Sequence, residues 1–233
     1  MNLYAYCLSD DVAAGAVEDV AGVAGASPRL VERAGISAVV SECGDEKIAV
    51  TRENVMAHER VVRRVLAGTT PLPFRFGTIV TEARLASYLD SRQGTLKAQL
   101  ERVRGAIEMS VKVIWKPVER GGGEDETAGE VAGGSGTKFL LKKRRELLGE
   151  SARRERAEEV GGWLARAVEG FVRESRVELQ PSENLILAAS HLVERARLAD
   201  YRAALGRAKM ERPELQFLTS GAWPPYSFTS VGP

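Results

Sequence analysis

The sequence predicts an α+β fold of two domains, and three observations indicate it. From residue 106 onward the apolar patterns follow the order strand, helix, strand, strand, helix, strand, which is the split βαβ, ferredoxin-like arrangement. Residues 107–115 alternate between apolar and polar side chains, as a strand does. The first half combines strands with a helix, a strand and a second helix, which predicts a mixed α/β unit of ferredoxin-like type. We therefore expect an N-terminal α+β domain over residues 1–105 and a C-terminal ferredoxin-like α+β domain over residues 106–233.

The N-terminal half begins with strand signals. Residues 3–8 and 36–43 are rich in strand-forming side chains, and residues 29–33 form a further candidate strand, with Gly35 at the turn. Residues 10–27 are rich in Gly, Ala and Val without helical periodicity. We expect that stretch to be mostly loop.

A helix is expected next. Thr51 is a suitable N-cap for a helix that runs to about Leu66 and stops at Gly68. Apolar spacing places four side chains on one face of this helix: Val55, His58, Val62 and Val65. The histidine therefore lies in the apolar stripe, and we expect it to be a packing residue.

Residues 72–80 have the composition of one strand, and Pro73 near its start favours an edge position. Thr81 is expected to open a second helix through Leu89, with a break at Gly94 before the helical face resumes.

The C-terminal half has one low-complexity segment followed by regular elements. Residues 117–136 are rich in Gly and acidic side chains, which predicts a mobile loop. A long charged helix is expected over residues 137–175, followed by strands at 176–180 and 185–193 and a last strand at 215–218. The helix before that last strand has four side chains on its apolar face: Leu198, Tyr201, Leu205 and Ala208.

Composition argues against nucleic acid and membrane as partners. Lys and Arg total 33, Asp and Glu total 32, and the net charge is +1, so no global field attracts a polyanion. No apolar run approaches the roughly 18 residues that span a bilayer, and the N-terminus lacks a signal-peptide pattern. Cys7 and Cys43 have no metal-binding spacing and are expected to be buried, reduced thiols. We expect a cytoplasmic protein.

The search for catalytic chemistry is negative. His58 and Glu59 begin a zinc-protease motif, but Val62 stands where the second histidine is required. His191, the other histidine, is expected in a strand. The glycine-rich residues 133–138 have the wrong order for a phosphate-binding loop. We therefore expect no enzyme activity, no metal and no cofactor.

Several short motifs, in a fixed order along nearly the whole chain, resemble one known family. They are Leu-Tyr-Ala-Tyr at 3–6, Ala-His-Glu-Arg-Val-Val at 57–62, Leu-Pro-Phe-Arg-Phe-Gly-Thr at 72–78, Phe-Leu-Leu-Lys-Lys-Arg at 139–144 and Trp-Pro-Pro-Tyr-Ser-Phe at 223–228. The helix with the His-Glu pair, the Phe-Arg-Phe-Gly segment and the terminal aromatic motif together resemble the GvpF/GvpL family of gas vesicle accessory proteins.

The resemblance implies a function that composition does not. Gas vesicles are hollow protein shells that give buoyancy, and the family supplies minor components of their assembly. The implied role is a non-enzymatic accessory protein that binds the small hydrophobic shell protein and other accessory proteins during nucleation, in the cytoplasm and associated with the vesicle. A ferredoxin-like enzyme or small-ligand-binding domain is the alternative, and it would need a convergent polar pocket.

Seven residues are the candidates for partner binding or for docking of one domain on the other: Arg75, Phe76, Trp223, Pro224, Pro225, Tyr226 and Phe228. Arg75 has two alternatives, a buried carboxylate or a partner protein. For the tail, residues 221–233, we expect packing back onto the fold along the domain junction. Two prolines reduce the entropy lost on ordering, and three free aromatic rings would promote aggregation.

Overall fold

The structure is a computed structural model. It describes residues 2–44, 47–115, 135–180 and 185–232. Most of the predicted acidic loop at 117–136, and the turn between the strands near residue 180, lie outside the described residues. No helix within the described part of the chain is long and apolar enough to cross a membrane.

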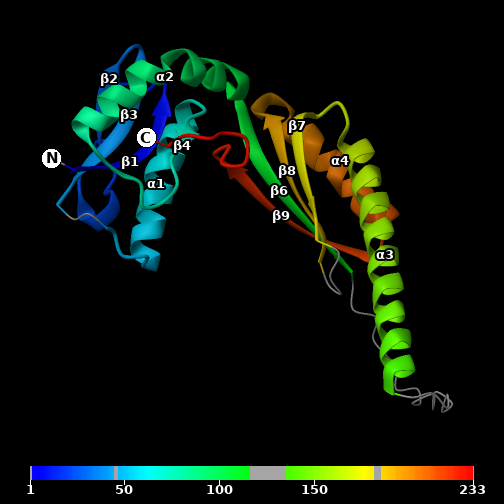
Figure 1. Cartoon of the computed structure of the whole chain (residues 1–233). Coiled ribbons are helices and arrows are strands. Elements are labelled where there is room, and N and C mark those ends of the chain that lie inside the picture. The colour runs from blue at the N-terminus through cyan, green and yellow to red at the C-terminus, as the bar shows by residue number, and fades with distance from the viewer. Residues whose placement is uncertain (1, 45–46, 116–134, 181–184, 233) are drawn as a thin grey trace. The chain divides into compact units, whose positions relative to one another are not determined.

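The chain forms two compact units, and the predicted α+β class is confirmed (Figure 1). Unit 1 consists of Met1–Met109, Leu192–Leu198 and Ser220–Pro233. Unit 2 consists of Ser110–His191 and Ala199–Thr219. The predicted division into domains after residue 105 stays a prediction.

The sheet of unit 1 is built around its first strand. β1 (Asn2–Ser9) pairs antiparallel with β3 (Ile36–Cys43), and β2 (Arg29–Arg33) pairs with the other edge of β3. On its second side β1 pairs with β4 (Leu72–Pro73) and β5 (Ile79–Thr81). The order is β2-β3-β1-β4, whose strands are labelled in Figure 1, and β5 pairs with β1. The three strands predicted before residue 44 are confirmed. A short 3-10 helix (Val23–Gly25) interrupts the predicted loop.

The prediction of one strand around Phe74 is wrong, because the chain leaves the sheet between β4 and β5. The backbone N–H of Phe74 still donates to the Tyr6 carbonyl at 2.9 Å. A turn follows, in which the Thr78 N–H donates to the Arg75 carbonyl at 3.2 Å and Gly77 has φ +85°. That left-handed conformation favours glycine, so Gly77 is a sequence signal for the turn. The strand-forming residues around it nevertheless led to the prediction of one continuous strand.

Two helices of unit 1 begin at the predicted threonines. α1 (Arg52–Gly68) begins after Thr51 and α2 (Glu82–Val103) after Thr81, and each threonine side chain accepts from a backbone N–H of the first turn. The predicted break at Gly94 is wrong, since α2 is continuous there. A glycine inside a helix costs about 1 kcal/mol, which burial of the helix's apolar face offsets. The buried side chains of that face are Leu85, Leu89, Leu96, Leu100 and Val103.

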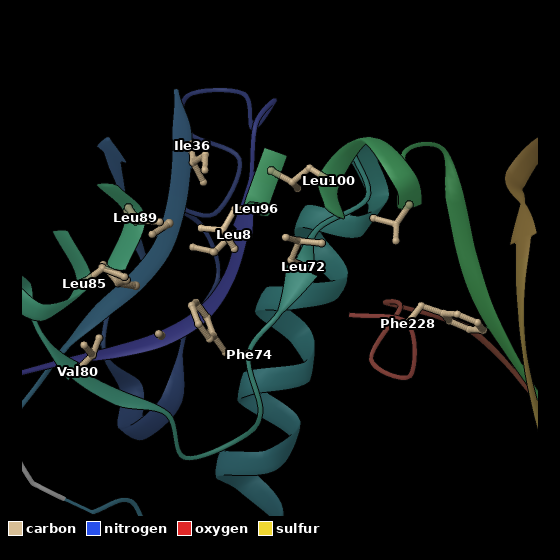
Figure 2. Packing of buried hydrophobic residues seen from close by; sticks show 14 of the residues in the cluster. Leu8, Ile36, Leu72, Phe74, Val80, Leu85, Leu89, Leu96, Leu100 and Phe228 are labelled. Carbon is tan, nitrogen blue, oxygen red and sulfur yellow. The ribbon is translucent and has the colours of Figure 1, made fainter. Parts of the chain in front are cut away.

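The strands separate two cores. Alternate residues of β1 enter different cores, so that Leu3 and Ala5 pack with α2 while Tyr4 and Tyr6 pack with α1. The pairing register of β1 shifts between Ala5 and Cys7, and this irregularity places Cys7 on the same side as Tyr6. Figure 2 shows the α2-side cluster, where labelled side chains from the sheet and from α2 point toward one another.

The second sheet has the strand order of the predicted split βαβ fold. The order is β7-β8-β6-β9. Its strands are β6 (Ala106–Trp115), β7 (Val172–Leu179), β8 (Leu185–Glu194) and β9 (Leu215–Trp223). The helices between them are α3 (Ser135–Val168) and α4 (Leu198–Glu211), with a 3-10 turn at Arg195–Arg197.

Two boundaries in this half differ from the predictions. α3 ends at Val168, because Gly170 takes φ +78° and starts the turn into β7, so Phe171 lies in a turn and not on the helix. β9 continues to Trp223 and so includes the first predicted tail aromatic. In unit 2, His191 is buried and its Nδ1 lies 2.9 Å from the Tyr201 hydroxyl, which accounts for a histidine inside a strand.

Candidate functional site

Four of the seven predicted residues meet at one surface hollow of unit 1. Arg75, Phe76, Trp223 and Tyr226 line it, in a space of about 460 Å³. Its remaining wall is the side of α1 that carries Val55, Met56, His58 and Glu59. The other three predicted residues, Pro224, Pro225 and Phe228, are buried.

The tail reaches the hollow through a turn. The Tyr226 N–H donates to the Pro224 carbonyl at 2.8 Å, and the Phe228 N–H donates to the Pro225 carbonyl at 3.1 Å. The segment is therefore compact. Phe228 is 1% exposed and belongs to the α2-side cluster that also holds Leu192.

Glu108 anchors the same turn, and sequence reasoning missed it. Its carboxylate accepts from the Ser227 N–H at 2.8 Å and from the Ser227 hydroxyl at 2.6 Å. Glu108 stands at a polar position of the alternating pattern of β6, and its side chain is only 6% exposed. The Arg102 guanidinium adds a hydrogen bond to the Phe228 carbonyl. No local pattern marks Glu108, because the residues that cover it come from the far end of the chain.

A histidine joins the tail to the first strand. His58 Nδ1 lies 2.9 Å from the Tyr4 hydroxyl, and its Nε2 lies 3.2 Å from the Tyr226 hydroxyl. Burial lowers the pKa of His58 to about 4, so the imidazole is neutral at pH 7. Burial raises the pKa of Tyr4 to about 12 and also raises the pKa of Tyr226, so both hydroxyls keep their protons. The Gly77 N–H, in the turn described above, donates to the Tyr4 oxygen at 3.0 Å.

The charged side chains around the hollow differ in whether they have an ion-pair partner. Glu59 pairs with Arg63 at 2.7 Å, and the Arg63 guanidinium lies 4.4 Å from the centre of the Trp223 ring. Arg75 is exposed and forms no ion pair with any side chain that the structure describes. Of its two predicted alternatives, the buried carboxylate is therefore absent from the described part of the chain.

The described residues contain no group of three or more His, Cys, Asp or Glu side chains that could hold a metal ion. Cys7 and Cys43 are both buried and neither is in a disulfide, and burial raises the pKa of the Cys7 thiol. The lining of the hollow offers apolar contact, hydrogen bonds and charge, which suit recognition of another molecule.

A sequence profile of the family described as gas vesicle synthesis protein GvpL/GvpF matches residues 2–230. The chain belongs to the GvpL/GvpF family. The resemblance seen in the sequence motifs is thereby confirmed. Motifs of this GvpL/GvpF-family chain supply the walls of the hollow, namely the His-Glu helix, the Phe-Arg-Phe-Gly segment and the terminal aromatic segment.

Curated relatives and solved structures agree with this assignment. Gas vesicle protein L1 of Halobacterium salinarum is 27% identical over 97% of this chain and 89% of its own length. Gas vesicle protein L of a Streptomyces species is 28% identical over 92% and 87%. The crystal structure of GvpF from Anabaena sp. has a TM-score of 0.77 at 21% identity, covering 99% of this chain and 97% of its own. GvpF from Microcystis aeruginosa also gives a TM-score of 0.77, at 18% identity and 99% of both chains. These structures share the fold.

Proposed function

We propose that this GvpL/GvpF-family protein is a non-enzymatic assembly factor of gas vesicles. It works in the cytoplasm and binds the hydrophobic shell protein and other accessory proteins during nucleation. Family membership supports the gas vesicle context, since the curated relatives are gas vesicle proteins over nearly the whole length of the chain. The observation that carries the binding role is the apolar hollow between α1 and the tail.

The walls of the hollow have the composition of a recognition surface. Met56 is 52% exposed and Val55 is 39% exposed, on the same side of unit 1 as Phe76 and Trp223. Aromatic, methionine and arginine side chains are enriched in protein interfaces. Methionine also adapts its shape to different partners. A contiguous group of exposed apolar side chains on a protein surface indicates a binding site for an apolar partner.

The hollow is also preorganised. Its tail wall is fixed by Glu108, Arg102 and the buried ring of Phe228, and its helix wall by the hydrogen bond between His58 and Tyr226. A wall that is already ordered loses little conformational entropy when a partner binds. We expect the surface to bind without rearrangement of unit 1.

Co-expression tests the proposal. An affinity tag on this chain should capture the shell protein expressed from the same gene cluster, and it should also capture accessory proteins of that cluster. A tagged ferredoxin-like protein of similar size and net charge serves as the control for non-specific adsorption of a hydrophobic protein. Capture of accessory proteins without any shell protein would disprove direct contact with the shell.

A further inference from the structure

We propose that the hollow recognises a segment of the shell protein in which an aliphatic side chain lies next to a carboxylate. The aliphatic side chain packs between Met56, Phe76 and Trp223, and the carboxylate pairs with Arg75. This inference rests on the proposed function and adds the chemistry of the contact. Three observations lead to it: the direction of the hydrogen bonds through His58, the charges at the rim, and the exposed apolar wall.

The two ring contacts of His58 fit either tautomer, and the burial of Tyr4 favours one of them. The Tyr4 oxygen already accepts from the Gly77 N–H, which can only donate. The Tyr4 hydroxyl is buried, so its own proton needs an acceptor, and His58 Nδ1 lies 2.9 Å away. A neutral imidazole with an accepting Nδ1 carries its proton on Nε2, and this N–H donates to the Tyr226 oxygen at 3.2 Å.

The hydroxyl proton of Tyr226 is therefore available to a ligand. Its oxygen accepts from His58, so its O–H is a donor, and the described residues offer that proton no acceptor within hydrogen-bond distance. Tyr226 lines the hollow. Because burial raises its pKa, the hydroxyl stays protonated at neutral pH. The hollow thus presents a fixed hydrogen-bond donor.

The rim adds a second donor. The Glu59 carboxylate is neutralised by Arg63, and Arg63 is engaged with the Trp223 ring. Arg75 is left as an exposed guanidinium that no described carboxylate pairs. Both available polar groups, the Arg75 guanidinium and the Tyr226 hydroxyl, donate hydrogen bonds. A ligand that fits must supply acceptor oxygens, and a carboxylate also supplies the opposite charge and a matching planar geometry.

The apolar wall determines the rest of the ligand. A space of about 460 Å³ lies within the range of roughly 300–1,000 Å³ typical of binding pockets, and it is bordered by exposed Val55 and Met56. Aliphatic side chains fill such a space without an unpaired polar atom. An aliphatic residue adjacent to an aspartate or glutamate satisfies both parts of the hollow.

Capture of co-expressed shell protein by variants of the full chain tests the polar contacts. Arg75→Gln should lower the captured amount about tenfold, as expected for loss of a charge-assisted pair. Tyr226→Phe should lower it about threefold, and Met56→Glu should abolish capture. Arg92→Gln, an exposed arginine on α2, is the matched control and should capture as the unchanged chain does. Unfolding midpoints of all variants show that the effects do not come from misfolding.

Cross-linking identifies the occupant. A photoreactive phenylalanine analogue at position 56 should cross-link to a shell-protein peptide in which an acidic residue follows or precedes an aliphatic one. Exchanging the charges, with Arg75→Glu here and arginine at that acidic position, should restore capture. Cross-links to a second copy of this chain, or equal capture by all variants, would overturn the assignment of the hollow and leave the proposed function standing. No capture by the unchanged chain would overturn both.

Discussion

Replacing Phe228 by alanine tests how strongly the tail stabilises unit 1. The ring is 1% exposed and packs in the α2-side cluster, while the backbone carbonyl that accepts from Arg102 is retained in the variant. Removal of a fully buried phenylalanine ring costs about 3–5 kcal/mol, since the lost apolar contact adds to the energy of the cavity. For a chain of 233 residues, each kcal/mol shifts the midpoint by about 2–4 °C, so we expect a decrease of roughly 6–20 °C.

Thermal unfolding followed by circular dichroism measures this decrease, and hydrogen exchange of the α1 and α2 amides reports on unit 1 by itself. Leu218→Ala is the control, because that side chain is half exposed and its removal should change stability by less than about 0.5 kcal/mol. A midpoint that moves no more for Phe228→Ala than for Leu218→Ala would show that the tail does not complete the core. The reasoning about its packing would then be refuted.

Three further predictions concern the backbone, a titration and a cap. Gly221→Ala should cost about 1–3 kcal/mol in urea unfolding, because φ there is +128° and a Cβ would lie 2.8 Å from the Glu108 carbonyl oxygen, a backbone atom; an unchanged midpoint would contradict that close approach. The pKa of His58 is lower in the fold, about 4, than its ordinary 6.5, so the unfolded chain binds the proton more readily and stability falls as the pH decreases. Between pH 7.5 and 5.5 this group should account for a loss of about 1.3 kcal/mol that His58→Gln removes, as unfolding at several pH values can show. Thr51→Ala should destabilise the chain by about 1 kcal/mol, since the Asn54 N–H loses its acceptor; Thr51→Ser, which keeps the hydroxyl, should leave the urea midpoint nearly unchanged.

The elements that sequence patterns predicted are those with local causes. β3 follows from a run of strand-forming residues, and α1 and α2 start at threonines whose hydroxyls satisfy free N–H groups. The segment around Phe74 failed because its course depends on the neighbouring strand. β1 pairs with β4 only up to Pro73 and with β5 only from Ile79, and Gly77 supplies the turn between the two pairings. Where β1 stops pairing with the segment cannot be seen in the segment's own composition.

The site shows the same division. Family motifs pointed to Arg75, Phe76, Trp223 and Tyr226, and the structure brings all four to one hollow although they lie about 150 positions apart in the chain. Glu108 was not predicted as a site residue, since alternation in a strand indicates which face a side chain occupies but not what covers that face. Whether a carboxylate is solvated or covered by the C-terminal tail depends on tertiary structure, which the local sequence pattern does not show.

The core of unit 1 places a constraint on biosynthesis. Its α2-side cluster combines residues of the first 109 positions with Leu192 and Phe228. A ribosome that adds about 5–20 residues per second needs roughly 6–24 s to travel from position 109 to position 228. Throughout that interval the cluster lacks the Phe228 ring, and the apolar surface that this ring covers stays exposed on the nascent chain. A chain that ends before position 228 therefore lacks the ring that completes this cluster.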